Sequence, residues 1–210
     1  MTDNVHSAIQ AIIQSAEKPG DGHGAQPKQP LITISREEGS LGDEVAARLA
    51  EKLGAQLHDK NVIERVAERM KADHSSVKAL DEAAGHVRDM WLYSLFTGKD
   101  LSRDHFRGHL VNVLLSFGRL GGVILGRGAH LVVANATTLR VRITAPETTC
   151  ARRYAATHNV TDQAALEHVR KVNHDRAKFV WDTFEQRHNE PSAYDLVINT
   201  DRIDDVDKVV

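Results

Sequence analysis

Residues 31–54 read LITISREEGSLGDEVAARLAEKLG, and this stretch decides the fold. Its first residues, Leu31 to Ile34, form a short apolar run that predicts a buried strand. Gly39 and Gly42 follow in a loop, and the residues after them have the apolar periodicity of a helix. Glycines let backbone N–H groups approach an anion, and a helix N-terminus adds partial positive charge. The order of strand, glycine loop and helix therefore predicts a phosphate-binding loop.

The loop lacks two side chains of the usual phosphate-binding pattern G-x-x-x-x-G-K-[ST]. In that pattern the Lys contacts the β- and γ-phosphates, and the hydroxyl group binds Mg²⁺. Here Gly42 stands at the Lys position and Asp43 stands at the hydroxyl position. The layout indicates a nucleotide kinase, but the chemistry of the loop is incomplete, so it indicates the fold more firmly than the function.

The composition is that of a soluble α/β domain. The 210 residues are 27% charged and 41% hydrophobic, and the net charge of −2 offers no basic field for nucleic acid. A single cysteine, Cys150, excludes an internal disulfide framework and fits a reducing compartment. No apolar run reaches the length of a membrane span, and the N-terminus lacks the basic region of a secretory signal. We therefore expect a cytoplasmic protein with no membrane or nucleic-acid partner.

The chain is expected to divide near residue 30. Residues 19–30 are rich in Pro, Gly and Gln and predict a flexible linker. Before them, Val5, Ile9 and Ile12 form a short helical stripe, which is either a loosely docked helix or a contact helix for a homodimer or another partner. Residues 31–210 then form one domain, with a helical insertion at 72–103.

Strands and helices alternate along this domain, which predicts βαβ units and a parallel sheet. The expected strands are Leu31–Ser35, Ala55–His58, Val123–Leu125, Leu139–Thr144 and Asp195–Asn199. The expected helices are Asp43–Leu53, Asn61–Lys71, Asp104–Arg119, Glu147–His158 and Asp162–Phe184, the last of them capped by Thr161 or Asp162.

Several blocks in order resemble the cytidylate kinase-like proteins of the P-loop nucleoside monophosphate kinase superfamily. These blocks are SREEGSLGDE at 35–44, HDK at 58–60, VILGRGA at 123–129, RVRITAPETTCARRY at 140–154, NHDRA at 173–177 and YDLVINT at 194–200. The resemblance implies a P-loop NTPase-like three-layer sandwich of about five parallel strands, with a helical lid and an acceptor-site insertion. It also implies ATP and Mg²⁺ as donor and cofactor, and a CMP-like acceptor.

The loop residues have two readings each. Gly39, Ser40 and Gly42 would donate backbone N–H groups to the ATP phosphates, or they form an ordinary strand-to-helix turn. Asp43 either stabilises the helix start or holds a hydrated Mg²⁺. Arg36 either binds phosphate in place of the missing Lys or makes a surface ion pair.

Two further positions are candidates for the acceptor site. Arg127 follows an apolar strand at its carboxyl end, where ligands bind in open parallel sheets, and Gly126 and Gly128 allow a close approach of the backbone. It would clamp the acceptor phosphate, or else form a structural salt bridge. Asp59 would orient the acceptor nucleotide or cap the following helix.

Three more arginines are implied by the resemblance to belong to a lid. Arg152 and Arg153 lie on the helix after the fourth strand, and Arg176 lies on the next long helix. Such a lid would close over the transferred phosphoryl group and exclude water, with Arg127 completing the catalytic set. The alternative for Arg152 and Arg153 is a solvated helix face.

No metal site is predicted from protein ligands alone. His105 and His109 are four residues apart on a helix, but the Glu of the zinc-protease pattern is absent and no third ligand is indicated.

Three functions then remain open: an ATP-dependent kinase for a CMP-like monophosphate, a nucleotide-binding or regulatory module with little transfer activity, and a kinase for another small acceptor. The module reading is favoured by the missing Lys and hydroxyl, and by Gly128, where cytidylate kinases have Asp.

Overall fold

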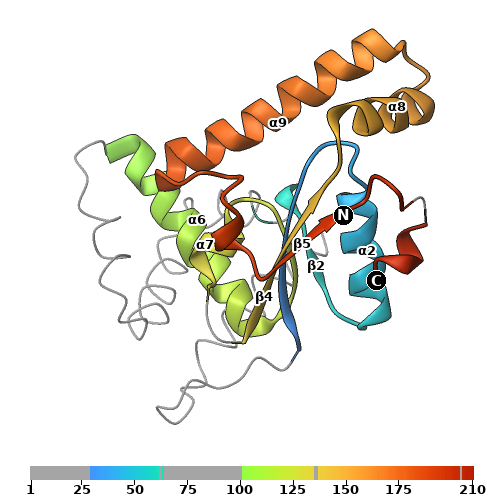
Figure 1. Ribbon diagram of the computed structural model, residues 1–210. Helices are drawn as coiled ribbons and strands as arrows, with labels where there is room; N and C mark the ends of the chain where they lie inside the picture. The colour runs from blue at the N-terminus through green and yellow to red at the C-terminus, as the bar shows by residue number, and fades with distance from the viewer. Residues whose placement is uncertain (1–28, 62, 64–100, 135–136, 204) are drawn as a thin grey trace. The chain divides into compact units, whose positions relative to one another are not determined.

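The computed structural model describes residues 29–61, 63, 101–134, 137–203 and 205–210 (Figure 1). The expected N-terminal helix lies outside these residues. So do most of the helix expected at 61–71 and most of the insertion expected at 72–103.

The chain divides into two compact units, which are described separately. The first unit consists of Met1–Leu31 and His58–Gly122, and the second consists of Ile32–Leu57 and Val123–Val210. The second unit holds the glycine loop and nearly all of the residues predicted to bind phosphate.

Five strands form one parallel sheet flanked by helices, as the alternation of the sequence predicts. The strand order is β2-β3-β1-β4-β5, so that β1 lies in the middle of the sheet. The strands are β1 (Leu31–Arg36), β2 (Leu57–His58), β3 (Gly122–Leu125), β4 (Thr138–Thr144) and β5 (Leu196–Asn199). β4 and β5 are parallel, with Val141 opposite Leu196 and Thr144 opposite Asn199.

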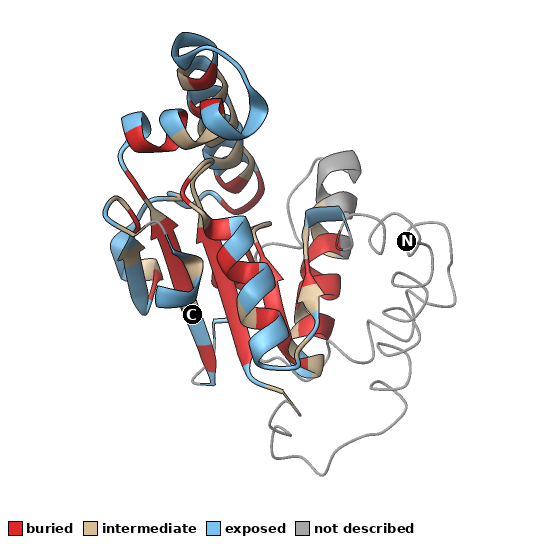
Figure 2. Cartoon of the chain, turned by 90° about the vertical axis from the view of Figure 1, so that its right-hand side faces the viewer, coloured by how far each residue is buried: buried red, intermediate tan, exposed pale blue. Residues whose placement is uncertain are grey.

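β1 is buried on both faces up to Ser35, because its first five residues are apolar or small. Leu31 to Ser35 are all buried, which is typical of a central strand in a parallel sheet. Ile32 and Ile34 pack with Val45 and Ala46 of helix α2 (Gly42–Lys52) in the main core of the second unit. Figure 2 shows the buried strands behind α2, whose outer face is exposed. The glycine loop is therefore held between a buried strand and a docked helix.

Helices α8 (Glu147–His158) and α9 (Asp162–Phe184) form an antiparallel hairpin, at the place where the sequence predicts a helical lid (Figure 1). The action of this hairpin as a lid stays a prediction. Thr161 caps α9, since its hydroxyl oxygen accepts a hydrogen bond from the backbone N–H of Ala164 at 3.3 Å. Small buried residues let the two helices approach closely; they are Ala151, Ala155 and Ala165.

Three short elements were not anticipated from the sequence. They are α7 (Ala129–Val132) and the 3-10 turns η1 (Pro191–Ala193) and η2 (Val206–Lys208). η2 carries Val206, which packs against the main core beside α2.

In the first unit, α6 (Leu101–Leu120) runs longer than the expected helix and has a fully buried stripe. The ring of His58 stacks on Phe117 of this helix, with their centres 4.0 Å apart. Burial lowers the pKa of His58 to about 4, although its hydrogen bond to the carbonyl of Gly121 and the charge of Asp59 oppose the shift. His58 is therefore a neutral packing residue at pH 7. None of the helices that the structure describes is long and apolar enough to cross a membrane.

Candidate functional site: an arginine-lined loop after the central strand

The loop after β1 turns sharply and fits closely against the hairpin. Gly39 has φ +75°, and a Cβ there would lie 2.5 Å from the carbonyl oxygen of Cys150, so only glycine fits. Leu41 also has a positive φ of 66°, and it precedes the first residue of α2. A non-glycine residue in this conformation is strained, and such strain collects at functional sites.

Ser40 holds the loop together from inside. Its buried hydroxyl donates to the carbonyl of Glu37 at 2.8 Å, and its own carbonyl accepts from the Thr200 hydroxyl at 2.8 Å. The Ser40 side chain is thus part of the loop framework, and its predicted backbone contact with phosphate stays a prediction.

Glu37 fastens the start of the loop to β4. Its carboxylate accepts from Arg142 at 2.9 Å and from the Thr144 hydroxyl at 2.7 Å. The Arg142 side chain is only 8% exposed, so this ion pair is mostly desolvated. Removing one partner of such a pair would leave a buried charge without compensation. These contacts tie the start of the loop to the end of β4.

Arg36 and Asp43 face each other across the loop. Arg36 Nε and Nη2 donate to the two carboxylate oxygens of Asp43 at 3.1 and 2.7 Å, a bidentate pair. Burial alone would raise the pKa of Asp43, but the hydrogen bonds and charge of Arg36, together with the charge of Arg176, lower it overall. Asp43 is therefore a carboxylate at neutral pH, and it is directed at a guanidinium.

Helix α9 reaches the same loop through the side chains of Arg176 and Asn173. The Arg176 guanidinium donates to Glu38 at 2.7 Å and to the carbonyl of Arg36 at 3.2 Å. The side-chain oxygen of Asn173 accepts from the backbone N–H of Glu38 at 2.8 Å. Burial and the neighbouring charge of Arg36 lower the pKa of Arg176, despite the opposing carboxylates of Glu38 and Asp43. The two guanidinium groups are thus close enough to interact, and each is paired with a carboxylate in this structure.

The segment after β3 forms the other side of the site. Gly126, Arg127 and Gly128 all have positive φ angles, at 79°, 55° and 71°. The guanidinium carbon of Arg127 lies 4.4 Å from the centre of the Phe179 ring on α9. A Cβ on Gly128 would lie 2.3 Å from the Phe184 ring, so this glycine lets α9 close on the turn. Residues 176 and 179 are neighbours on one helix face, so α9 brings Arg176 and Arg127 into the same region.

The two remaining lid arginines differ from each other. Arg152 is exposed on α8. Arg153 donates to the carbonyls of Thr200 and Ile203 at 2.7 and 2.9 Å and to the Thr200 hydroxyl at 3.2 Å, which anchors the segment after β5. The structure therefore brings together Arg36, Arg127 and Arg176 of the predicted set, whereas Arg152 and Arg153 lie on α8 outside this group. Their predicted catalytic role stays a prediction.

Asp59 belongs to the first unit, directly after β2. Its carbonyl accepts from the backbone N–H of Ile63 at 3.0 Å, as in the first turn of a helix. The predicted contact of Asp59 with an acceptor nucleotide stays a prediction.

A buried polar network supports the sheet edge beneath the site. His188 contacts the Ser35 hydroxyl at 2.9 Å and Arg142 Nη1 at 3.3 Å, and its carbonyl accepts from Tyr194 at 2.7 Å. The Tyr194 ring also stacks on His130, with centres 4.6 Å apart. Burial, with the charge of Arg142 among further causes, lowers the pKa of His188 to about 4 and that of His130 to about 3. Both rings are neutral at pH 7.

Cys150 has no reactive character. Burial, followed by the charge of Glu37, raises the pKa of its thiol to about 11, so the thiol stays protonated.

Among the described residues there is also no group of three or more His, Cys, Asp or Glu side chains that could hold a metal ion.

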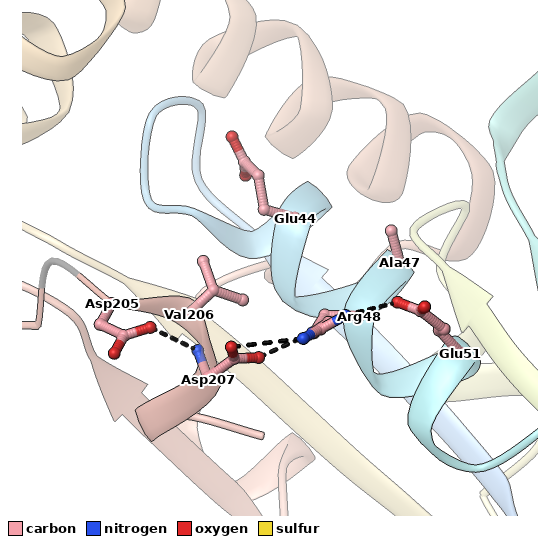
Figure 3. A pocket seen from close by; sticks show the side chains of 7 residues that line it. All are labelled: Glu44, Ala47, Arg48, Glu51, Asp205, Val206 and Asp207. Atoms are coloured by element: carbon pink, nitrogen blue, oxygen red, sulfur yellow. Dashed lines mark hydrogen bonds and ion pairs between the residues drawn. The ribbon is translucent and has the colours of Figure 1, made fainter.

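A pocket of about 420 Å³ lies along α2 and η2 (Figure 3). Its lining includes Arg48 and four carboxylates, those of Glu44, Glu51, Asp205 and Asp207. Arg48 donates to Asp207 at 2.7 Å and to Glu51 at 2.8 Å, so its charge is already matched. This lining would repel a phosphate, and we therefore assign the candidate site to the loop instead.

Sequence reasoning missed the partners that hold the arginines. Glu38 and Phe179, which contact Arg176 and Arg127, were not singled out for any role at the site, because these contacts join residues far apart in sequence. Arg142, which pairs with Glu37, was missed for the same reason, whereas Asp43, the partner of Arg36, was among the candidates. A weak signal existed for α9: residues 173 and 176 lie on one helix face within a block that resembled a known family.

Comparisons with known proteins bear on the family and the fold. The cytidylate kinase-like family matches residues 31–202. The crystal structure of an uncharacterized protein from Eubacterium ventriosum aligns with a TM-score of 0.64 at 22% identity, covering 86% of this chain and 93% of that one. Shikimate kinase from Bacteroides thetaiotaomicron aligns with a TM-score of 0.45 at 14% identity, covering 85% and 94%. No curated protein matches the chain.

Proposed function

From the premise that this chain belongs to the cytidylate kinase-like family, we propose that it transfers the γ-phosphoryl group of Mg-ATP to a small nucleoside monophosphate, CMP or a close analogue. The observation that carries the proposal is the convergence of Arg36, Arg176 and Arg127 around one loop at the carboxyl end of β1. Phosphoryl transfer needs alignment of two phosphates and stabilisation of charge more than covalent chemistry.

The donor phosphates lie against the loop and the start of α2. The first helical hydrogen bond of α2 runs from the N–H of Val45 to the carbonyl of Leu41, so the N–H groups of its first turn, from Gly42 to Glu44, have no partner within the helix and can face an anion. The N–H of Ser40 instead donates to the carbonyl of Glu37 at 3.4 Å. Gly39, Ser40 and Gly42 shape this loop, and Arg36 and Arg176 add charge beside it. The loop therefore replaces a single Lys by two guanidinium groups.

The residues fit Mg²⁺ that is bound chiefly by ATP and water. Mg²⁺ needs one or two carboxylates and otherwise keeps waters and phosphate oxygens. The Asp43 side chain is 53% exposed, and its pKa is lowered, so it is an accessible, ionised carboxylate. It can therefore serve as the protein ligand that Mg²⁺ needs. When bound, the metal neutralises charge on the β- and γ-phosphates.

The acceptor phosphate binds Arg127. The strained turn of Gly126, Arg127 and Gly128 points this guanidinium toward α9, and α9 carries Arg176 one turn away from Phe179. Closure of the α8–α9 hairpin excludes water from the transferred group, with Arg152 and Arg153 as further lid arginines in this proposal. Asp59 is the proposed contact for the acceptor nucleoside.

A second candidate is a nucleotide-binding module with little transfer activity. One observation favours it: Asp43 and Glu38 already neutralise Arg36 and Arg176. A nucleotide must therefore replace two carboxylates before both arginines can bind it. A kinase for another small acceptor remains the third candidate.

We also retain two proposals on context. The protonated Cys150 thiol and the ordinary charge balance fit the cytoplasm. A homodimer or another partner would bind through the helix expected near the N-terminus, at residues that lie outside the described part of the chain.

The test is a coupled assay of ADP release from Mg-ATP with CMP, dCMP, UMP, AMP and GMP. Turnover with one acceptor that is lost in Arg127→Met, but kept in Arg170→Met, supports the kinase. Arg170 is the matched control, because it lies on the surface of α9 in an exposed pair with Glu147. No turnover, with ATP or CMP still raising the melting temperature, identifies the binding module. No turnover and no shift contradicts both.

A further inference from the structure

The Arg36 side chain runs through space left by two glycines. A Cβ on Gly42 would lie 2.3 Å from Cβ of Arg36 and 2.6 Å from its Cγ. A Cβ on Gly126 would lie 2.8 Å from Nη1 of Arg36. The aliphatic part of the Arg36 side chain (its stem) is therefore accommodated at the start of α2, and its guanidinium group (its head) is accommodated at the end of β3.

Gly42 needs to be glycine for a steric reason. Its backbone lies outside the left-handed region, so its conformation would accept any side chain. The obstacle is the stem of Arg36, and a side chain at position 42 could not share that volume. In the usual phosphate-binding loop, position 42 is the one that carries the Lys. Arg36 thus fills the place where that side chain would begin.

The head of Arg36 lies between the two halves of the site. Nε and Nη2 face Asp43 at the start of α2, and Nη1 faces Gly126, next to Arg127. Its side chain is 12% exposed, so it is fixed by its surroundings yet accessible to a ligand. The donor loop and the turn that carries the proposed acceptor arginine therefore both adjoin the same guanidinium.

We propose that Arg36 is a catalytic residue that replaces the missing Lys and binds the phosphoryl group in transfer. This inference rests on the proposed function. Asp43 holds the guanidinium fork until a phosphate with the same bidentate geometry replaces the carboxylate. In this exchange a phosphate takes the place of the Asp43 carboxylate, so the partly buried guanidinium of Arg36 always has a negatively charged partner.

The experiment is titration calorimetry of ATP and ADP, with Mg²⁺, on the wild-type chain and on Arg36→Met. We expect ATP affinity to fall at least about tenfold in Arg36→Met, because charge-assisted hydrogen bonds are lost, and ADP affinity to fall less. Arg170→Met, an exposed change on α9, should bind as the wild type does. Unchanged ATP affinity in a folded Arg36→Met overturns the inference, whereas a wild-type chain that binds neither nucleotide contradicts the proposed function itself.

A second variant keeps the test open if Arg36→Met does not fold. Asp43→Asn leaves Arg36 in place but replaces its charged partner by a neutral amide, which binds the guanidinium less strongly. In this variant ATP without Mg²⁺ should therefore bind more tightly, by about tenfold. The same change in an Arg36→Lys background should give a smaller gain, because Lys lacks the planar fork. Equal gains in both backgrounds, or no gain in either, would overturn the exchange of partners.

Discussion

The guanidinium of Arg127 stacks over the ring of Phe179, with 4.4 Å between the guanidinium carbon and the ring centre. This contact joins the turn after β3 to helix α9, and it orients the arginine proposed to bind the acceptor phosphate. Arg127 also has a φ of 55°, a strained conformation that its surroundings must hold in place.

Replacing Phe179 by Leu should raise the KM for the acceptor more than that for ATP. The cation–π contact is worth about 0.5–2 kcal/mol, which corresponds to roughly a 2- to 30-fold change. Phe179→Trp retains an aromatic face and serves as the control. Steady-state kinetics on the wild type, Phe179→Leu and Phe179→Trp would check this. If the acceptor KM of Phe179→Leu equals that of the wild type, Phe179 does not orient the acceptor arginine.

Gly42→Ala should destabilise the second unit by about 1–3 kcal/mol, because its Cβ overlaps the stem of Arg36. Urea denaturation gives the free energy of unfolding. In an Arg36→Gly background the same change should cost far less, since the obstructing side chain is gone. An equal cost in both backgrounds would show that the overlap is not the cause.

Arg153→Met should destabilise the fold by about 1–3 kcal/mol, because three hydrogen bonds to Thr200 and Ile203 are lost and buried acceptors remain. Arg152→Met, its exposed neighbour, is the matched control and should change stability by less than about 0.5 kcal/mol. Equal stability of the two variants in urea would contradict the anchoring role of Arg153.

Stability should fall as the pH drops from 7 to 5. The pKa values of His130 and His188 are about 3 and about 4 in the folded chain, below the ordinary 6.5 of the unfolded chain. The unfolded chain therefore binds more protons between these values, and stability rises with pH there. Each ring contributes about 1–2 kcal/mol over this window.

Urea denaturation at pH 5, 6 and 7 would measure this dependence. Carboxylates stay ionised over most of this range in both states, so they add little. His188→Gln should reduce the slope by about one proton, even if it lowers stability at every pH. A slope that His188→Gln leaves unchanged would mean that the ring is not held neutral by burial and by Arg142.

The fold was largely predictable because local signals agree with the global arrangement. Both ends of α8 and α9 match the expected Glu147–His158 and Asp162–Phe184, since Pro146, Thr161 and the left-handed Asn159 mark the boundaries. β2 is shorter than the expected Ala55–His58, and α7 was missed, because two- to four-residue elements carry no periodic signal.

The site was predictable only in part. Arg127 could be chosen because it follows a buried strand, and Arg36 because it borders a glycine loop. The contacts of Phe179 with Arg127 and of Asn173 with the backbone of Glu38 could not be derived, since they depend on where α9 lies and not on nearby sequence. Asp43, the partner of Arg36, was already a candidate site residue because it stands at the start of the helix. The steric reason for Gly42 was also hidden, because a glycine next to a helix start is expected from turn chemistry alone.

The most direct measurement follows the fate of labelled phosphate from [γ-³²P]ATP in the presence of Mg²⁺ and CMP, with products separated by chromatography. The account predicts label in the nucleoside diphosphate, and loss of that product in Arg127→Met but not in Arg170→Met. The same measurement is repeated with dCMP, UMP, AMP and GMP as acceptors. If, with all five monophosphates, the label stays in ATP or appears only as inorganic phosphate, the chain is not a nucleoside monophosphate kinase.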